Sequence, residues 1–184
     1  MDPALTPNTR LTFITGPVRS GKTRLALQMA RSIPEPRAYI ATAQGLDSEM
    51  AQRIYRHQEE RGSTFQTIEE PLALSSRLKE IQDQYAIVVI DCLTLWVSNL
   101  AGAMGEKEQE IQKRLDDFLN VLAFVPVPVI LIGNEVGWGI VPDNALARTF
   151  RDLSGRLHQA IAQLADQVIL MVAGIPLVVK GKKL

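Results

Sequence analysis

Eight consecutive residues near the start of the chain have the spacing of a phosphate-binding loop. The pattern GxxxxGK[ST] is met by Gly16, Pro17, Val18, Arg19, Ser20, Gly21, Lys22 and Thr23. A strand is predicted directly before the pattern and a helix directly after it, which is the context that makes it informative. In such a loop backbone N–H groups and the helix N-terminus bind phosphates, Lys22 reaches the β/γ oxygens and Thr23 ligates Mg²⁺. The motif predicts an enzyme that binds a nucleoside triphosphate with magnesium and moves a phosphorus-containing group from it.

A second candidate metal ligand, Asp91, ends an apolar run at 87–90. A carboxylate at this position has the form of a Walker B acid, which holds magnesium directly or through water. Asp91 could also cap a helix that begins near Leu93, and one carboxylate can serve both ends. The Asn-Lys-x-Asp pattern that reads guanine in regulatory GTPases does not occur in the sequence. The spacing therefore does not determine which base is bound.

His57 is one of two histidines and lies among polar residues on a predicted helix. On the pattern alone, a solvated histidine is the simpler interpretation. The alternative is a nucleophile, because a neutral imidazole can attack phosphorus and a histidine pKa of about 6.5 leaves the ring mostly neutral at cellular pH. The nearby Arg53, Arg56 and Arg61 would steady a transferred phosphate.

Apolar runs rich in β-forming residues alternate with longer segments of helical spacing, which predicts a parallel sheet. Strands are expected at 11–15, 38–41, 86–90, 127–132 and 168–172. The runs at 87–90 and 129–132 are apolar on both faces, as expected where helices cover both sides of a sheet. The predicted fold class is an α/β P-loop NTPase fold with RecA-like order. Because ligands of such sheets bind at the carboxyl ends of the strands, the loops there should converge.

The remaining expected elements complete one domain. Helices are predicted at 106–124, from Asp47 or Ser48 to Gly62, and at 144–165, with short strands at 65–68 and 176–179. We expect residues 1–10 to be a flexible leader, 11–180 a single catalytic domain and 181–184 a tail.

Composition narrows the class of protein. The 184 residues are 46% hydrophobic, and 20 Lys+Arg balance 20 Asp+Glu. A nucleic-acid-binding protein usually has a basic surface, so no nucleic-acid partner is expected. The longest apolar stretch, 121–132, contains two prolines and is shorter than the roughly 20 residues that span a bilayer. The single cysteine, Cys92, suits a reducing cytoplasm and is expected to be buried.

Four further segments carry a resemblance to a known family. They are ATA at 41–43, DSEMAQRIYRHQ at 47–58, NEVGWGIVP at 134–142 and RTFRD at 148–152. With the phosphate loop, in this order and spacing, they resemble the bifunctional adenosylcobinamide kinase/adenosylcobinamide-phosphate guanylyltransferase family over 11–180.

The resemblance implies a two-step cytoplasmic enzyme of cobalamin biosynthesis. The corrinoid adenosylcobinamide is phosphorylated with ATP or GTP, and GMP from a GTP is then transferred to that phosphate. In the family the GMP is first attached to a histidine, and the matching position here is His57. The resemblance also implies a homo-oligomer, with a trimer expected.

Carried over by position, the resemblance implies two catalytic residues, His57 and Lys22. It implies nucleotide contacts from Gly16 to Thr23 and from Ala41, Thr42, Ala43, Gln58, Glu59, Glu60, Arg61, Glu69 and Asp91. The metal ligands would be Thr23 and Asp91. Glu69 could instead be an exposed capping residue before Pro71.

Three positions depart from the family pattern. Some members have two adjacent histidines where this chain has Arg56 and His57, and glutamate is common where Asp91 stands. His158 replaces a frequent asparagine, and we expect it to serve in packing or at the surface.

Other features leave alternatives open. The glycine-rich loop 134–142 could approach a ligand or be a structural turn. Arg148 and Arg151 lie three apart on a predicted helix, and could bind the corrinoid phosphate or a neighbouring chain's nucleotide, or pair with Asp143 or Asp152. The rival functions are a single-activity small-molecule kinase, in which His57 is idle, and a RecA-like ATPase module.

Overall fold

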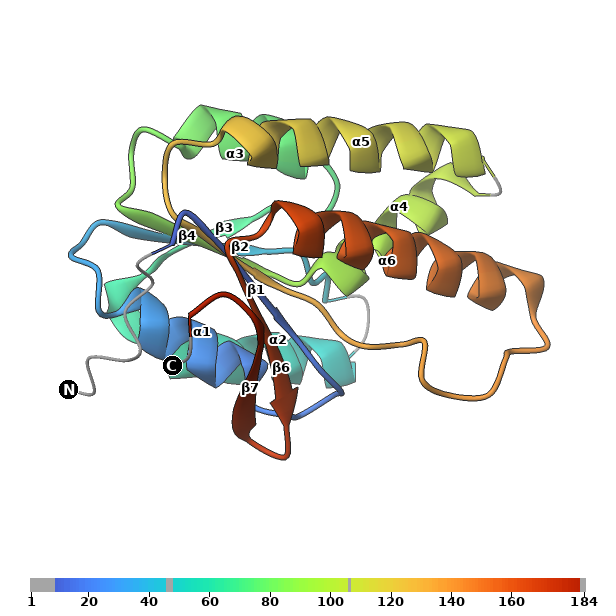
Figure 1. Ribbon diagram of the computed structural model, residues 1–184, viewed down its shortest axis with the longest axis horizontal. Coiled ribbons are helices and arrows are strands. Elements are labelled where there is room, and N and C mark those ends of the chain that lie inside the picture. Colours follow the sequence, from blue (N-terminus) through green and yellow to red (C-terminus); the bar gives the residue numbers. More distant parts are fainter. Residues whose placement is uncertain (1–8, 46–47, 106, 183–184) are drawn as a thin grey trace.

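A computed structural model describes residues 9–45, 48–105 and 107–182; in helix α2 the side chains of residues 49–51, 53, 56, 57 and 60 are outside the description. Within these residues seven strands form one sheet (Figure 1). The strands are β1 (Leu11–Thr15), β2 (Arg37–Ala41), β3 (Gln66–Glu69), β4 (Ile87–Asp91), β5 (Val129–Ile132), β6 (Gln167–Val172) and β7 (Ile175–Lys180).

The lateral order of the strands is β3-β2-β4-β5-β1-β6-β7. Neighbouring strands from β3 to β6 run parallel, and β7 pairs antiparallel with β6. The central strand is therefore β5, which separates β1 from β4, and β1 lies between β5 and β6. The prediction of a mostly parallel sheet with 176–179 at its edge is confirmed.

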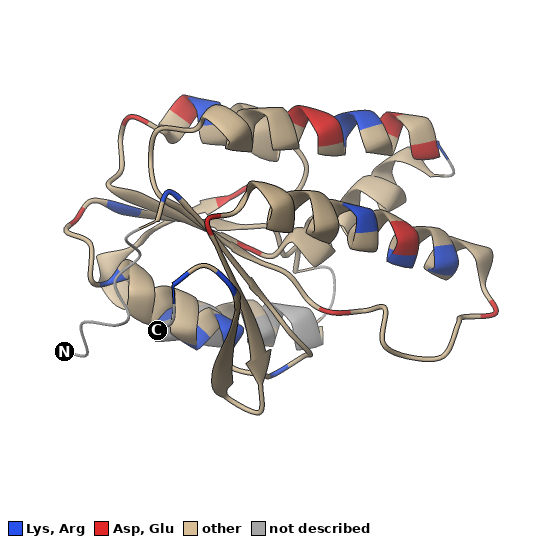
Figure 2. Cartoon of the chain, viewed as in Figure 1, with Lys and Arg blue, Asp and Glu red and all other residues tan. Residues whose placement is uncertain are grey.

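Helices cover both faces of the sheet, as predicted. Their bounds are α1 (Lys22–Ala30), α2 (Ser48–Arg61), α3 (Leu74–Ile81), α4 (Leu93–Met104), α5 (Glu108–Phe124) and α6 (Ala145–Leu164), with a 3₁₀ turn at Gly62–Thr64. In Figure 1, α1 and α2 lie below the sheet, and α3, α5 and α6 above it. Positive and negative residues are interspersed along α5 and α6 (Figure 2).

The strands are apolar on both faces because each face has its own core. In β4, Val88 and Ile90 join the core between the sheet and helices α3 to α6. Ile87 and Val89 join the core between the opposite face of the sheet and α1. Successive side chains of a strand point to opposite faces, so a strand covered on both sides must be apolar throughout.

The element boundaries differ slightly from the expectations. The strand expected at 65–68 lies one residue later, because Phe65 packs in the α1 core while Glu69 pairs with Ala41. The helix expected from Asp47 or Ser48 begins at Ser48, and Asp47 lies outside the described residues. Arg10, grouped above with the leader, donates from Nη1 to the Leu122 carbonyl at 2.7 Å. None of the described helices is long and apolar enough to cross a bilayer.

Candidate active site

The phosphate loop connects the carboxyl end of β1 to the N-terminus of α1, as the motif predicts. Gly16 has φ +141°, and a Cβ at this position would lie 2.5 Å from the Met171 carbonyl oxygen on β6. Only glycine fits there without moving a neighbouring strand. Gly21, with φ +93°, forms the N-cap of α1. The loop backbone is thus bent so that the helix N-terminus faces the end of the sheet, where an anion is stabilised.

Lys22 is buried beneath this loop. Its ammonium group donates to the carbonyl oxygens of Gly16 at 2.9 Å and Pro17 at 2.6 Å, and Ser20 Oγ lies 3.4 Å away. These contacts compensate a buried charge and hold it at the inner side of the loop. A bound phosphate would meet this cation directly.

Asp91 and Thr23 meet at the loop. Thr23 Oγ1 donates to Asp91 Oδ2 at 2.8 Å, and the hydroxyl of Tyr39 donates to the same oxygen at 2.6 Å. Burial raises the pKa of Tyr39 well above its ordinary value, and Asp91 raises it further, so Tyr39 stays a hydrogen-bond donor. The pair of oxygens from Thr23 and Asp91 fits Mg²⁺, which prefers oxygen ligands and usually binds one or two carboxylates together with substrate phosphates. The described residues contain no cluster of three or more His, Cys, Asp or Glu that could hold a metal.

The Tyr39 hydroxyl gives a first testable prediction. Tyr39→Phe removes a buried donor to a charged acceptor, so we expect the free energy of unfolding to fall by about 1.5–3 kcal/mol. Urea unfolding measures the change, with Tyr85→Phe as the control, for which about 0.5 kcal/mol or less is expected. Equal effects of the two substitutions would contradict the importance of the Tyr39–Asp91 bond.

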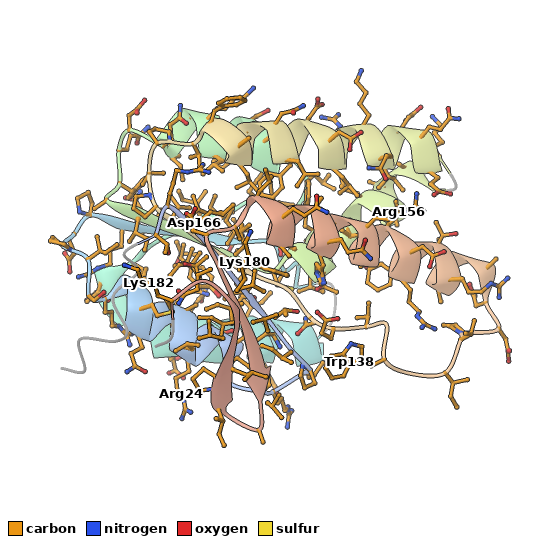
Figure 3. All side chains as sticks on the ribbon, in the orientation of Figure 1. Arg24, Trp138, Arg156, Asp166, Lys180 and Lys182 are labelled. Atoms are coloured by element: carbon orange, nitrogen blue, oxygen red, sulfur yellow. The ribbon has the colours of Figure 1, made fainter. Side chains whose placement is uncertain are left out.

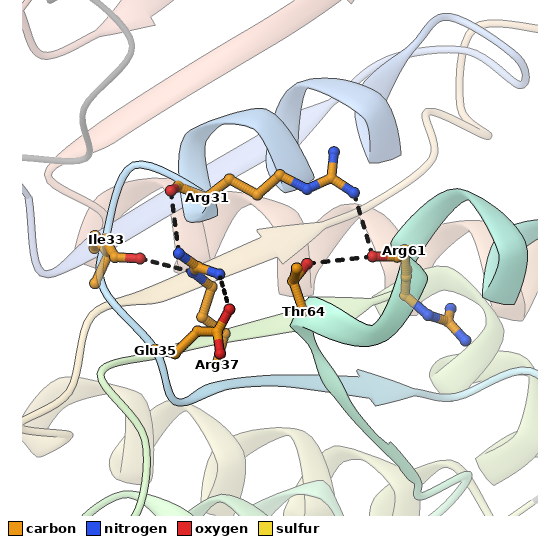
Figure 4. A network of polar contacts seen from close by, with 6 residues as sticks. All are labelled: Arg31, Ile33, Glu35, Arg37, Arg61 and Thr64. Atoms are coloured by element: carbon orange, nitrogen blue, oxygen red, sulfur yellow. Dashed lines mark hydrogen bonds and ion pairs between the residues drawn. The ribbon is translucent and has the colours of Figure 1, made fainter.

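Arg61, the last residue of α2, places a charged group in the same region. It is only 3% exposed, and its Cζ lies 4.1 Å from the centroid of the Tyr39 ring. The Arg61 carbonyl accepts hydrogen bonds from Arg31 and Thr64, whereas the guanidinium points away from them (Figure 4). Its Nε and Nη2 are buried and have no hydrogen-bond partner among the described residues. The Tyr39 ring compensates part of the charge, but the two nitrogens keep free hydrogen-bond donors, so this guanidinium is suited to binding an anion.

These groups line one cavity of about 790 Å³ at the carboxyl ends of the strands. The candidate residues that line it are Val18, Arg19, Ser20, Gly21, Lys22, Thr23, Ala41, Ala43, Gln58, Arg61, Glu69 and Asp91. The predicted convergence of the strand-end loops is therefore observed. Other candidates do not line this cavity: Gly16, Pro17, Thr42 and Glu59. Thr42 is buried, and its hydroxyl donates to the Cys92 carbonyl and accepts from the Cys92 N–H, both at 2.8 Å.

Two candidates fall partly outside what the structure describes. The backbone of α2 includes His57 and Glu60, but their side chains are among those not described. A smaller cavity of about 510 Å³ adjoins the first and shares Ala43, Ile54, Gln58 and Glu69 with it.

Cys92 is buried, as expected, and its role is structural. Burial raises the pKa of the thiol to about 12, so it stays protonated. Its Sγ accepts the Leu95 N–H at 3.4 Å and caps α4. The capping role that the sequence left open for Asp91 thus belongs to Cys92.

Arg148 and Arg151 brace the loop 134–142 rather than pairing with acidic side chains. Arg148 donates to the carbonyls of Pro142 and Asp143, and Arg151 donates to those of Ile140 and Gly137. The ion pairs suggested with Asp143 or Asp152 are not found among the described residues, because backbone carbonyls nearer to each guanidinium take its donors. Trp138 projects from this loop and is exposed (Figure 3).

His158 packs in the interior, which confirms one of its two expected roles. Its ring lies 5.1 Å from that of Phe13, and it faces Gly133 at the end of β5. A Cβ on Gly133 would lie 2.6 Å from His158 Nε2. The segment after β5 therefore needs glycine at its first position.

This contact gives a second prediction. Gly133→Ala should lower the free energy of unfolding by about 1–3 kcal/mol, because the added methyl group forces the buried imidazole to shift. Urea unfolding measures it, with Gly137→Ala as the control, since a Cβ at that position meets nothing within 4 Å. In the Gly133→Ala/His158→Ala pair the losses should be less than additive. Strict additivity would show that His158 is not the obstacle.

Comparison with solved structures bears on the fold. A prototypical ATPase from the type III secretion system of pathogenic bacteria superposes with a TM-score of 0.54 at 13% identity, covering 89% of this chain and 51% of that chain. At this identity the likeness shows the fold alone. The predicted P-loop NTPase fold class is confirmed.

Comparison of sequences is more specific. The bifunctional adenosylcobalamin biosynthesis protein CobP of Pseudomonas aeruginosa is 40% identical over 172 residues, which cover 94% of this chain and 98% of that protein. The corresponding CobU of Salmonella typhimurium is 38% identical over 91% of this chain and 98% of its own length. The family described as "Cobinamide kinase / cobinamide phosphate guanyltransferase" matches residues 12–179. The chain belongs to this family. The resemblance inferred from the sequence motifs is thus confirmed.

Several residues lining the cavity were not singled out from sequence. They are Arg24, Tyr39, Ile54, Leu95, Ile132, Ala173 and Gly174, whereas Asn134 belongs to the loop 134–142, for which a ligand-binding role was left open. Tyr39 lies within an apolar strand and has the pattern of a core residue. Gly174 lies in the β6–β7 turn, and its backbone N–H donates to the Ser20 carbonyl at 3.1 Å. Arg24 follows Lys22 by two residues on α1 and offered the clearest sequence clue, a further cation beside the phosphate loop (Figure 3).

Proposed function

We propose that this protein phosphorylates adenosylcobinamide with ATP or GTP and then transfers GMP from GTP to adenosylcobinamide phosphate, giving adenosylcobinamide-GDP. The observation that carries the proposal is the shared cavity. Lys22, Thr23 and Asp91 line it together with Ile54, Gln58 and Arg61 of α2. The phosphate-binding loop and the helix that carries position 57 thus border the same space, which supports two reactions on nucleotides at one site.

The kinase step needs little covalent participation from the protein. The loop N–H groups and Lys22 hold the triphosphate, and the substrate hydroxyl oxygen attacks the γ-phosphorus. The bond from the γ-phosphorus to the bridging oxygen breaks, the diphosphate leaves, and the hydroxyl proton goes to solvent. Mg²⁺, held by Thr23 and Asp91 with the phosphates, would neutralise phosphate charge.

The transferase step uses a different phosphorus atom. We place His57 as the nucleophile: an imidazole nitrogen attacks the α-phosphorus of GTP, the bond to the bridging oxygen breaks, and pyrophosphate leaves. An oxygen of the corrinoid phosphate then attacks the same phosphorus, and the phosphorus–nitrogen bond breaks. These two steps return His57 to its free state.

The helical position of residue 57 supports this role. Ile54, Gln58 and Arg61 line the cavity, and they are spaced as one face of α2. Position 57 follows 54 by three residues and precedes 61 by four, so it belongs to the same face. The neighbouring Arg61 guanidinium supplies a buried cation for phosphate oxygens.

Nucleotide and corrinoid assays test the proposal. Purified protein with Mg²⁺, adenosylcobinamide and ATP should form adenosylcobinamide phosphate, and added GTP should convert it to adenosylcobinamide-GDP, as followed by chromatography of the corrinoids. Formation of the phosphate alone, with no GDP derivative, would reduce the protein to a single-activity kinase. Nucleotide hydrolysis without any corrinoid product would favour an ATPase module.

We also propose that the protein acts as a homo-oligomer in the cytoplasm, with a trimer as the expected state. The loop 134–142 supports self-association, because it exposes Trp138, Ile140 and Val141, and Ile140 is 96% exposed. Exposed apolar groups held in place by a braced loop are typical of an interface. Sedimentation equilibrium would measure the mass, and a monomer at micromolar concentration would contradict the proposal.

A further inference from the structure

The segment that follows β5 crosses the candidate active site. Because β5 lies between β1 and β4, the chain leaving β5 passes between the phosphate loop after β1 and Asp91 at the end of β4. Asn134, two residues beyond β5, lines the cavity together with Lys22, Thr23 and Asp91. In phosphate-binding loops the lysine contacts β/γ oxygens, and Thr23 and Asp91 would hold a magnesium ion that neutralises phosphate charge. A side chain between these groups faces the place of the γ-phosphate.

The backbone of this segment is held at three successive residues. The Gly133 N–H donates to the Ile14 carbonyl at 3.0 Å, and the Glu135 N–H donates to the Gly16 carbonyl at 3.1 Å. Between them, the Asn134 N–H donates to Thr94 Oγ1 on α4 at 2.7 Å. Asn134 is thus bonded to α4, and its two neighbours are bonded to β1 and to the phosphate loop.

The side chain of Glu135 adds a fourth attachment. Thr15 Oγ1 donates to Glu135 Oε1 at 2.5 Å, and His158 Nδ1 lies 3.6 Å from the same oxygen. The contact with His158 lowers the pKa of Glu135 from its ordinary value of 4.5; burial opposes this shift and the Thr15 bond adds to it. The carboxylate is therefore ionised at neutral pH and keeps the segment beside Thr15.

The Asn134 amide, by contrast, has unused hydrogen-bonding capacity. Its Nδ2 contacts Cys92 Sγ at 3.8 Å, a weak interaction, and Oδ1 accepts no hydrogen bond from the described residues. An amide carries two N–H donors and one acceptor oxygen. A half-buried amide on a rigid backbone, with free donors facing a phosphate cavity, is suited to bind an anionic ligand.

We propose that Asn134 is a catalytic residue of the kinase step, whose Nδ2 donates a hydrogen bond to an oxygen of the γ-phosphoryl group as it moves to the substrate hydroxyl. The inference rests on the proposed function. As the bond to the attacking oxygen forms and the bond to the β-bridging oxygen breaks, charge is spread over the three equatorial oxygens, and a fixed donor stabilises it without reorganisation. Guanylyl transfer reacts at the α-phosphorus, so this contact matters less there.

The test compares nucleotide affinities and rates in Asn134→Ala and Asn134→Asp. Calorimetry with Mg²⁺ and a non-hydrolysable ATP analogue should show binding weakened by about 10-fold to 100-fold in Asn134→Ala, while ADP affinity stays at the wild-type value. The turnover number for ³²P transfer from γ-labelled ATP to adenosylcobinamide should fall by about 10²-fold. Asn134→Asp should be worse than alanine, because a carboxylate repels the γ-phosphate. Asn120→Ala, exposed on α5, serves as the control.

Loss of triphosphate and diphosphate affinity together would overturn the inference, since it would make Asn134 a structural residue. Unchanged triphosphate affinity and turnover would overturn it as well. Far-ultraviolet circular dichroism and thermal unfolding establish that each variant is folded. If the wild type binds nucleotides but forms no corrinoid phosphate, the proposed function fails, and the affinity comparison still decides whether Asn134 contacts the γ-phosphate.

Discussion

Replacing His57 with alanine is expected to abolish covalent guanylylation of the protein. The wild type, incubated with α-³²P-GTP and Mg²⁺, should retain a label through denaturing electrophoresis. The label should be acid-labile and alkali-stable, as a phosphorus–nitrogen bond is. His57→Ala removes the nucleophile itself, so the loss should be complete rather than partial. Conversion of adenosylcobinamide phosphate to the GDP derivative should be lost with it.

The kinase activity of the variant distinguishes loss of the nucleophile from misfolding. Phosphorylation of adenosylcobinamide by ATP should continue at about the wild-type rate in His57→Ala and in His57→Asn, because that reaction does not use the imidazole. Gln52→Ala, exposed on the same helix, should keep both activities. A labelled His57→Ala protein would place the nucleophile elsewhere, and an unlabelled wild type would return His57 to a solvated surface role.

Replacing Lys22 with alanine is expected to impair both reactions. The buried ammonium group under the phosphate loop is the cation expected to contact the β/γ oxygens, and both steps begin from a bound triphosphate. Losing one preorganised donor costs about 10²–10³ in rate, and we expect that fall in each half-reaction. Single-turnover assays of γ-phosphoryl transfer and of α-³²P labelling measure the two effects separately.

The two variants are expected to differ in their kinase activity, which falls in Lys22→Ala and is retained in His57→Ala. Lys79→Ala, on the exposed side of α3, controls for the loss of a positive charge. Lys22 also bonds the loop carbonyls, so the variant's thermal unfolding must be recorded alongside its rates. Guanylylation at the wild-type rate in Lys22→Ala would show that GTP binds away from the phosphate loop during the transferase step.

Much of the fold could be predicted from sequence because its determinants are local. The phosphate loop lies where the motif predicted it, since a strand, a bend that requires glycine and a helix N-terminus follow one another without a gap. The position of Asp91 followed from the end of an apolar run. The edge strand β7 was also expected, although its antiparallel direction depends on the tight turn at Ala173 and Gly174.

The roles of the arginines were harder to predict. Arg148 and Arg151 were correctly expected on one helix, but their partners are backbone carbonyls of a loop that ends only a few residues earlier. Sequence spacing says which side chains lie near one another on a helix, and it does not say how an irregular loop folds back over them. The stacking of Arg61 on Tyr39 had no sequence signal either, because it depends on how the end of α2 packs against β2.

The sequence by itself determined the type of chemistry: a phosphate loop with its lysine, a carboxylate at a strand end and a set of motifs specific to one family. Only the tertiary structure decided which strand lies between β1 and β4, and therefore that Asn134 faces the site. Tyr39 likewise has the pattern of a core residue until its hydroxyl is found against Asp91. The physical reason is that the lateral order of parallel strands is set by packing between elements distant along the chain, which local hydrophobic periodicity does not encode.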